Sequence, residues 1–258
     1  MIKYIPLTIL FLGLSTSPLM ASCPSTPWGE PSIQSTTNIC HQGYYTAYDS
    51  ENKIPGFVSW VLTEKAAQGC NGRDGQFSRD PMANGKDVSP STYDNSGYDR
   101  GHLADANDFN YDHNLEVQSF YMTNMTPQVP GLNRGPWKWV EEASRNWAVD
   151  EHQVTIYAGP VISRDDKRFN GVDVPKFFWK IIIDSTNNDS ITFLMPNKKF
   201  SSKAVPETIV SINDIQNITG IKFPLPKTID VNKKANMDDW PVDFKDFHDK
   251  KSSVCTIK

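Results

Sequence analysis

The chain has 258 residues, of which 38% are hydrophobic and 11% aromatic, and its formal net charge is −4. This composition excludes an intrinsically disordered protein, and the length allows one large domain with a hydrophobic core or at most two modest ones. Affinity for nucleic acid comes largely from cationic contacts to phosphate, so an acidic chain needs a local concentration of basic residues to bind one.

The N-terminal segment is similar to a secretory signal peptide. Lys3 precedes an apolar run from Ile5 to Leu14, which is much shorter than the ~20 residues that a membrane-spanning helix needs. Removing residues 1–22 takes away Lys3 and no acidic residue, which leaves 25 basic and 30 acidic side chains and a net charge of −5. We therefore expect export to the periplasm or the extracellular space, without stable insertion in a membrane.

The four cysteines predict two disulfide bonds, because an even number of cysteines in an exported protein is typical of paired thiols. Three pairings are possible. Cys23–Cys40 with Cys70–Cys255 is favoured because it closes one short loop and pins the C-terminus. The alternative is a lipid anchor at Cys23, since residues 20–23 are similar to a bacterial lipoprotein processing site, and it would leave one cysteine unpaired.

The remaining elements predict one α+β domain over residues 23–258. An extended arm over Pro24–Ser35 comes first, and β-branched and aromatic residues then predict four strands. These strands are Gly56–Leu62, Val154–Ala158, Phe177–Ile183 and Ile191–Met195. Their almost continuous apolar character favours a central, mainly antiparallel sheet that is covered by helices. Helices are predicted over Asn133–Val149 and Ala204–Thr219, the domain core over about 44–225, and a charged tail after it.

Residues 99–141 concentrate the side chains that can carry chemistry. Hydrolysis of a phosphodiester needs an activated water and stabilisation of the charge that develops on oxygen. His102 is the natural general base, because imidazole titrates near neutral pH. Asn133 can offer a neutral amide oxygen to Mg²⁺, a hard cation that keeps several of its own waters. This combination predicts a nuclease.

Helical spacing adds a metal face and a basic stripe. If Asn133 and Glu141 share one helix, eight residues place them about 80° apart and two turns along one side, so Glu141 could hold metal-bound waters. Arg134, Lys138 and Arg145 fall within about 40° of one another beside this face, where they would bind the substrate backbone. Asn133 could instead be only the N-cap of the helix, because a proline follows three residues later.

Three segments resemble, in order and spacing, the DNA/RNA non-specific endonuclease family of secreted ββα-metal nucleases. They are Asp99–Ala104, Phe120–Gln128 and Leu132–Glu141, and looser similarity extends from Tyr44 to Asn197. The resemblance implies a ββα-metal active-site motif and a Mg²⁺ cofactor that Mn²⁺ can replace. It also implies an endonuclease that hydrolyses both DNA and RNA and leaves 5′-phosphate ends.

The same resemblance implies roles for the residues that carry it. His102 would be the general base, Asn133 the one direct protein ligand of the metal, and Glu141 the anchor of the metal-bound waters. The family has a catalytic arginine upstream of these residues. Arg73 matches it, although Arg79 competes for that role and is otherwise expected to bind substrate.

Two further members of the motif complete the predicted site. The resemblance makes Asn124 a site-supporting residue, grouped here with the catalytic set, and Arg100 a residue that faces phosphate. Residues 124–126 also form a glycosylation sequon. A glycan inside the site would block the metal, so the pattern favours export from a bacterium.

The chain departs from the family pattern at two positions. Asp105 stands where the family often has a proline, and Phe120 stands where a supporting polar residue is expected. These departures motivate an alternative, a catalytically impaired nucleic-acid-binding module of the same fold. An esterase or a metalloprotease is disfavoured, because the sequence has neither a Gly-x-Ser-x-Gly nor a His-Glu-x-x-His motif.

Overall fold

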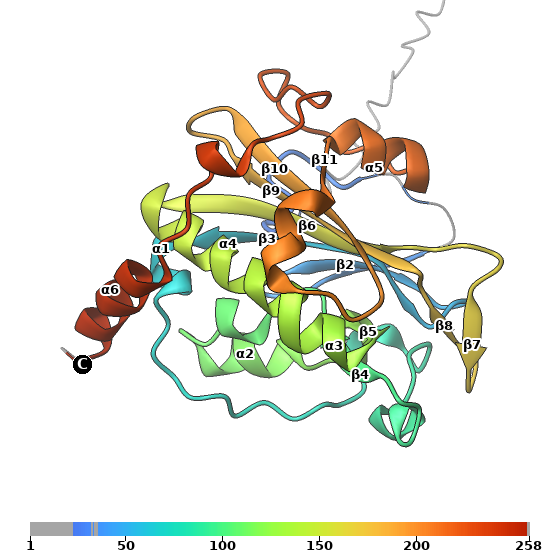
Figure 1. Ribbon diagram of the computed structural model, residues 1–258. Coiled ribbons are helices and arrows are strands. Elements are labelled where there is room, and N and C mark those ends of the chain that lie inside the picture. The colour runs from blue at the N-terminus through green and yellow to red at the C-terminus, as the bar shows by residue number, and fades with distance from the viewer. Residues whose placement is uncertain (1–22, 32, 34–35, 257–258) are drawn as a thin grey trace, which may run out of the picture.

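A seven-stranded, fully antiparallel sheet forms the centre of the computed structural model, which describes residues 23–31, 33 and 36–256 (Figure 1). In spatial order its strands are β1 (Thr37–Cys40), β2 (Tyr45–Asp49), β3 (Ile54–Thr63), β6 (Gln153–Val161), β9 (Phe177–Asp184), β10 (Asp189–Pro196) and β11 (Ile209–Val210). The α+β class and the antiparallel sheet are thus confirmed, and all four predicted strands lie in it. The predicted signal peptide, residues 1–22, lies outside the described residues.

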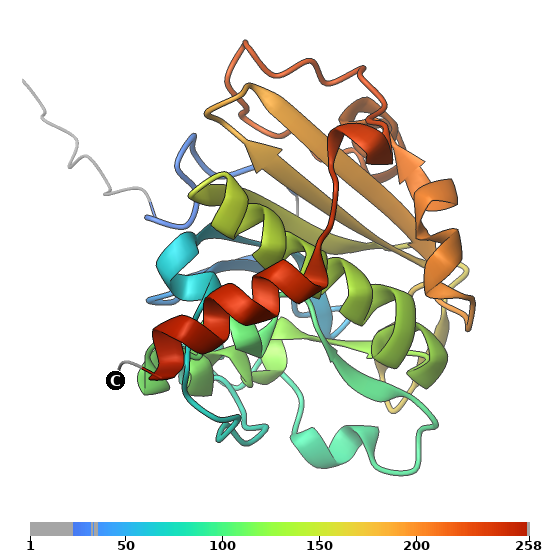
Figure 2. The same ribbon diagram turned by 60° about the vertical axis from the view of Figure 1, so that its left-hand side comes forward.

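The two faces of the sheet bury two different hydrophobic clusters, because successive side chains of a strand point to opposite faces. On β9, Phe178 and Ile182 join the cluster that contains α4, whereas Trp179 and Ile183 join the cluster that contains α5. The helices are α1 (Glu64–Ala67), α2 (His113–Ser119), α3 (Pro130–Leu132), α4 (Lys138–Asp150), α5 (Ile212–Thr219) and α6 (Phe244–Thr256). Helix α6, which the sequence does not predict, packs across α4 (Figure 2).

Short elements connect this scaffold to the segment that carries the motif. Two small antiparallel sheets are formed by β4 (Asp99–His102) with β5 (Met125–Gln128) and by β7 (Lys167–Phe169) with β8 (Val172–Val174). Short 3₁₀ helices span Pro81–Ala83, Pro90–Tyr93, Ala106–Asp108, Met122–Asn124, Ser202–Thr208 and Met237–Asp239. The β4–β5 pair places the Asp-Arg-Gly-His motif beside the start of α4.

Both predicted helices are shorter than expected. A π-helical turn at Asn133–Trp137 separates α3 from α4, because Gly135 leaves the helical path with φ −125° and ψ −106° just before a proline. Residues 204–219 do not form one helix either, because a 3₁₀ helix and β11 precede α5. The β-branched Ile209 and Val210 pair with β10, so α5 begins only after Ser211, whose side chain caps the helix.

Two disulfide bonds join distant parts of the chain, in the pairing that the sequence favours. Cys23–Cys40 ties the N-terminal arm to β1, and Cys70–Cys255 ties α6 to the loop after α1. With Cys23 paired, all four cysteines are accounted for. Among the described residues, none of the helices is both long and apolar enough to cross a membrane.

Candidate active site

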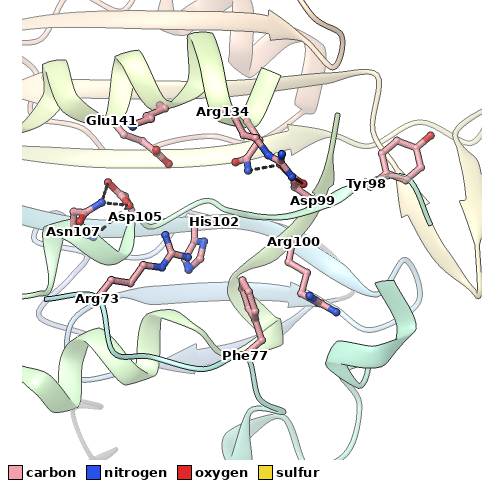
Figure 3. Close-up of a pocket in the computed structure, with 12 residues that line it drawn as sticks. Arg73, Phe77, Tyr98, Asp99, Arg100, His102, Asp105, Asn107, Arg134 and Glu141 are labelled. Carbon is pink, nitrogen blue, oxygen red and sulfur yellow. Dashed lines mark hydrogen bonds and ion pairs between the residues drawn. The ribbon is translucent and has the colours of Figure 1, made fainter. Parts of the chain in front are cut away.

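A cleft of about 550 Å³ opens between β4 and the N-terminal part of α4 (Figure 3). Its lining residues are Arg73, Phe77, Tyr98, Asp99, Arg100, His102, Asp105, Asn107, Asn133, Arg134, Lys138 and Glu141. The structure therefore brings together seven of the sequence-predicted site residues. Asn124, Arg145 and Arg79 do not line the cleft.

His102 ends β4, where it pairs with Met125 of β5. Its side chain is buried, and the Nε2 atom has no hydrogen-bond partner among the described residues. Burial lowers the pKa of His102 to about 4, with Asp105 opposing the shift and the Arg73 cation adding to it. The imidazole is therefore neutral at neutral pH and free to accept a proton.

Phe120, one of the two departures from the family pattern, packs against this imidazole. Its ring packs edge-to-face against His102, with centroids 4.8 Å apart, and the Arg73 guanidinium carbon lies 4.8 Å from the same ring centroid. Gly75 allows this packing, since a Cβ there would lie 2.1 Å from the Phe120 ring. Glu116 holds the loop in place by accepting the backbone N–H groups of residues 74 and 75. The aromatic ring thus positions both Arg73 and His102.

Asn124 holds the backbone that follows His102 and does not reach the cleft. The fully buried amide accepts the N–H of Ala104 at 2.9 Å and donates to the carbonyl of Ala104 at 2.8 Å. It also donates to the carbonyl of Ser119 at 2.7 Å. Grouping Asn124 with the catalytic residues is therefore corrected to a positioning role, because all of these contacts are made to backbone inside the core.

Asp99 fixes the orientation of Asn133. The Nδ2 atom of Asn133 donates to the Asp99 carboxylate at 2.9 Å. A carboxylate only accepts, so the amide oxygen of Asn133 is turned away from Asp99 and left available to a cation. The side chain of Asn133 makes no helix-capping hydrogen bond, which removes the alternative that it is only an N-cap.

Asp99 also holds Arg134 at the mouth of the cleft. The guanidinium donates through Nε and Nη2 to the two carboxylate oxygens at 2.8 and 2.7 Å. Burial raises the pKa of Asp99, but the hydrogen bonds from Arg134 and Asn133 outweigh it and hold the pKa below its usual value. Asp99 therefore stays ionised and orients two residues of the site. The side chain of Lys138, the first residue of α4, is exposed.

Glu141 faces the cleft from the first turn of α4 and is mostly buried. Burial raises its pKa well above the usual value, and the Asp105 charge acts in the same direction. Figure 3 shows Glu141 on the α4 side, across from His102 and Arg73. Asn133 and Glu141 share the cleft although the turn between them is π-helical, so they are not on the continuous helix that the spacing predicts.

Arg145 is not part of an exposed basic stripe. Its side chain is only 8% exposed, and Nη1 forms ion pairs with Asp105 and with Asp108, the latter at 2.9 Å. Burial raises the pKa of Asp105, but the charge of Arg145 outweighs this effect and holds the pKa of Asp105 at about 2. For Asp108, burial is the larger effect and raises the pKa to about 6. The predicted substrate contact of Arg145 is therefore corrected, because two buried carboxylates draw the side chain inward.

The other predicted arginines divide between the cleft and the surface. Arg100 lines the cleft and is held by the carbonyl of Pro90 at 3.0 Å and by Asp94 at 2.6 Å. Arg79 lies outside it, where it bonds to the carbonyl of Asp87 at 2.9 Å. Of the two candidates for the upstream catalytic arginine, only Arg73 thus lies beside the base.

Lys180 is a buried cation that sequence reasoning missed. It lies on β9 with no exposed surface, and its Nζ is 4.6 Å from the ring centroid of Trp137 and 5.4 Å from that of Trp60. Trp137 in turn donates to the backbone carbonyl of His102 at 3.0 Å. Burial lowers the pKa of Lys180, and the charge of Glu141 opposes this shift. A lysine between apolar strand residues is the only signal that the sequence offers.

The donor set of the cleft fits a hydrated hard cation. Within the described residues, no group of three or more His, Cys, Asp or Glu side chains could hold a metal ion. A metal site here has to combine an amide oxygen, carboxylate-bound waters and substrate oxygens, which is the mode that Mg²⁺ favours. The free amide oxygen of Asn133 and the carboxylate of Glu141 provide these two kinds of donor.

Comparisons with known proteins indicate the family of the chain. The family model for the DNA/RNA non-specific endonuclease matches residues 28–227. A nuclease from Nostoc sp. is 30% identical over 193 residues, which cover 70% of each chain, and human mitochondrial endonuclease G is 28% identical over 204 residues, which cover 70% of this chain and 67% of the relative. The solved EndoG/EndoGI complex superimposes with a TM-score of 0.69 and 25% identity over 78% of this chain and 89% of the other. The chain belongs to the DNA/RNA non-specific endonuclease family, a family of metal-dependent hydrolytic nucleases.

Proposed function

We propose that the protein is an exported, Mg²⁺-dependent endonuclease that hydrolyses phosphodiester bonds in DNA and RNA without sugar preference. The observation that carries this proposal is the cleft that His102, Asn133 and Glu141 share. Each residue alone has a structural explanation, but a neutral buried base, a free amide oxygen and a carboxylate in one cleft are what hydrolysis of a phosphodiester requires.

His102 acts as the general base. Its neutral imidazole takes the proton of the attacking water, and Phe120 and the hydrogen bond from Trp137 hold it in place. A base positioned in this way accelerates a reaction by roughly 10²–10⁴-fold. Arg73, packed on the same aromatic ring, places a positive charge where the phosphate becomes more negative.

Asn133 would hold the metal directly through its amide oxygen, and Glu141 would hold it through bound water. The bound cation, Mg²⁺ or in its place Mn²⁺, would stabilise negative charge on the phosphate and leaving oxygens. Asp99 keeps the amide oxygen of Asn133 turned away from itself. The scissile phosphate would lie between this pair and His102, with Arg100, Arg134 and Lys138 along the cleft wall as backbone contacts.

Export is part of the proposal. Disulfides form and persist in oxidising compartments, and both pairs in the structure suit the periplasm or the extracellular space. We infer that residues 1–22 are removed as a signal peptide and that the source is a bacterium. N-terminal sequencing and intact mass of the exported protein check this inference; a lipidated Cys23 would contradict it.

Digestion of plasmid DNA and of RNA, with and without a chelator, tests the function. We expect wild-type protein to cleave both in Mg²⁺ and to stop when the metal is removed. The His102→Ala variant should lose roughly 10²–10⁴-fold in rate. The matched control is His152→Ala, because His152 is exposed just after the C-terminal end of α4 and its side chain pairs, among the described residues, with Glu64 alone. Undiminished cleavage by His102→Ala would contradict the mechanism, and DNA retention without hydrolysis would indicate the impaired binding module.

A further inference from the structure

A second, smaller recess of about 140 Å³ adjoins the cleft. It is lined by Tyr98, Val129, Lys167, Val174, Pro175, Lys176 and Asn197. Tyr98 lines both the recess and the cleft, and Figure 3 shows it at the end of the cleft beyond Asp99, on the side away from Glu141. The cleft and the recess thus meet at Tyr98, and the β7–β8 hairpin contributes Lys167 and Val174 to the recess.

The hairpin that forms one side of the recess is firmly docked. Phe169 of β7 stacks on Tyr98 with ring centroids 5.6 Å apart and meets Tyr93 edge-on at 5.2 Å. Asn170, at the turn, donates to the carbonyl of Thr92 at 3.0 Å. These contacts fix the hairpin to the loop that leads into the Asp-Arg-Gly-His motif, so the recess keeps its position relative to His102.

Asn197 fixes the other side of the recess. Its amide donates to the carbonyls of Pro127 at 3.0 Å and Pro175 at 2.9 Å, and it accepts the N–H of Val129 at 2.8 Å. One side chain thus joins β5, the start of α3 and the loop before β9. A surface built in this way needs no reordering when a ligand binds, which lowers the entropic cost of binding.

The charges of the recess suit an anion. Lys167 and Lys176 are exposed, and neither forms an ion pair with any residue in the part of the chain that the structure describes. The neighbouring Arg168, by contrast, pairs with Asp173. No carboxylate of the described residues lines the recess. In a protein of net charge −4, two unneutralised cations beside the cleft attract a polyanion locally.

We propose that this recess binds the nucleotide next to the scissile phosphodiester, with Lys167 and Lys176 contacting its backbone phosphate and the aromatic and aliphatic wall contacting its sugar and base. The inference rests on the proposed function, because it assumes that the cleft holds a nucleic-acid strand. Arg145 is buried and paired, so it adds no exposed positive charge near the cleft; Lys167 and Lys176 of the recess provide that charge instead. The recess thus lengthens the substrate-binding surface by one nucleotide beyond the bond that is cleaved.

The test compares Lys167→Ala/Lys176→Ala with wild-type protein in two assays. One assay is the steady-state cleavage of a 20-nucleotide single-stranded DNA in Mg²⁺, and the other is the binding of the same labelled DNA in chelator by fluorescence anisotropy. We expect KM and Kd to rise by on the order of ten-fold with kcat unchanged. The slope of log Kd against log salt should fall by about 0.7 for each phosphate that the variant no longer neutralises.

Two control variants separate this effect from general loss of charge. Lys167→Arg/Lys176→Arg should restore wild-type KM and Kd. Lys222→Ala removes an exposed lysine on the opposite side of the sheet, between residues of the α5 cluster, and should change neither. Unchanged Kd and salt slope in the double alanine variant would overturn the inference. If wild-type protein binds but does not cleave, the proposed function fails, while a loss of binding in the double variant still supports the recess.

Discussion

At the scale of single residues, Asp99 connects Asn133, the proposed metal ligand, to Arg134, a proposed substrate contact. One oxygen accepts from Asn133 and both oxygens accept from Arg134. Groups that orient a metal ligand contribute to metal affinity although they never touch the ion. Substitution of Asp99 therefore tests the orientation of the Asn133 side chain while Asn133 itself stays in place.

The Asp99→Ala substitution is expected to lower activity at limiting Mg²⁺ by roughly 10–100-fold, because the amide of Asn133 is then free to rotate. High Mg²⁺ should recover part of this loss, and Mg²⁺ titration of the cleavage rate measures both effects. The matched control is Asp189→Ala, which removes a surface ion pair with Lys233 far from the cleft. A wild-type Mg²⁺ profile for Asp99→Ala would contradict the orienting role.

The residue scale also shows what sequence reasoning can reach. Motif spacing groups His102, Asn133 and Glu141, and all three line one cleft in the structure. Motif spacing cannot predict where the Arg145 side chain points, because that direction depends on two buried carboxylates far away in the sequence. The sequence does not predict the role of Lys180 for a similar reason. An apolar side chain is expected at this position of the strand, and the aromatic rings around Lys180 come from other elements.

At the scale of elements, the active site depends on two irregular segments. The π-helical turn at Asn133–Trp137 changes the phase between α3 and α4, which is why angles computed for one continuous helix do not apply. The backbone after His102 is equally irregular: Leu103 donates to the backbone carbonyl of Asn124, and Ala104 bonds to the side chain of Asn124. A periodic sequence pattern predicts regular elements well, but these two segments are specified by tertiary contacts.

The Asn124→Ala substitution is expected to destabilise the fold by about 3 kcal/mol, because it leaves buried backbone groups of Ala104 and Ser119 without partners. Cleavage should also slow at temperatures where the protein stays folded, as the segment next to His102 loosens. Urea unfolding and activity at about 25 °C measure the two effects. Asn114→Ala, at an exposed position on α2, should change stability by less than about 0.5 kcal/mol. Equal effects of the two variants would contradict the prediction.

At the scale of the whole molecule, two covalent links hold peripheral segments to the sheet. Cys23–Cys40 spans 17 residues, whereas Cys70–Cys255 spans 185 and brings the C-terminal helix against α4. The central strands and their burial follow from apolar patterning, because each of these strands buries both of its faces. Helix α6 cannot be predicted in the same way, since its charged sequence shows only the few apolar residues that dock it.

Removing the disulfides one at a time should show the difference in loop length. Each pair of cysteine-to-serine substitutions is expected to lower the free energy of unfolding by roughly 2–4 kcal/mol, with the larger loss for Cys70–Cys255 because it closes the longer loop. Denaturant unfolding of both variants under identical buffer conditions provides the comparison, with the other disulfide intact in each as an internal control. A greater loss for Cys23–Cys40 would contradict the expectation.

The loop that carries Arg73 is held at its two ends and at residues 74 and 75, whose N–H groups donate to Glu116. Residues 71–77 contain neither helix nor strand; Cys70 anchors one end covalently, and the bridge between Ser78 and Tyr121 anchors the other. The reach of the Arg73 guanidinium therefore depends on how many residues separate it from Cys70 on one side and from the Glu116 contact on the other. One inserted or deleted residue changes that reach by up to about 3.5 Å and leaves the sheet untouched. The number of residues in this loop, more than their identity, therefore sets where evolution or design can place the Arg73 guanidinium.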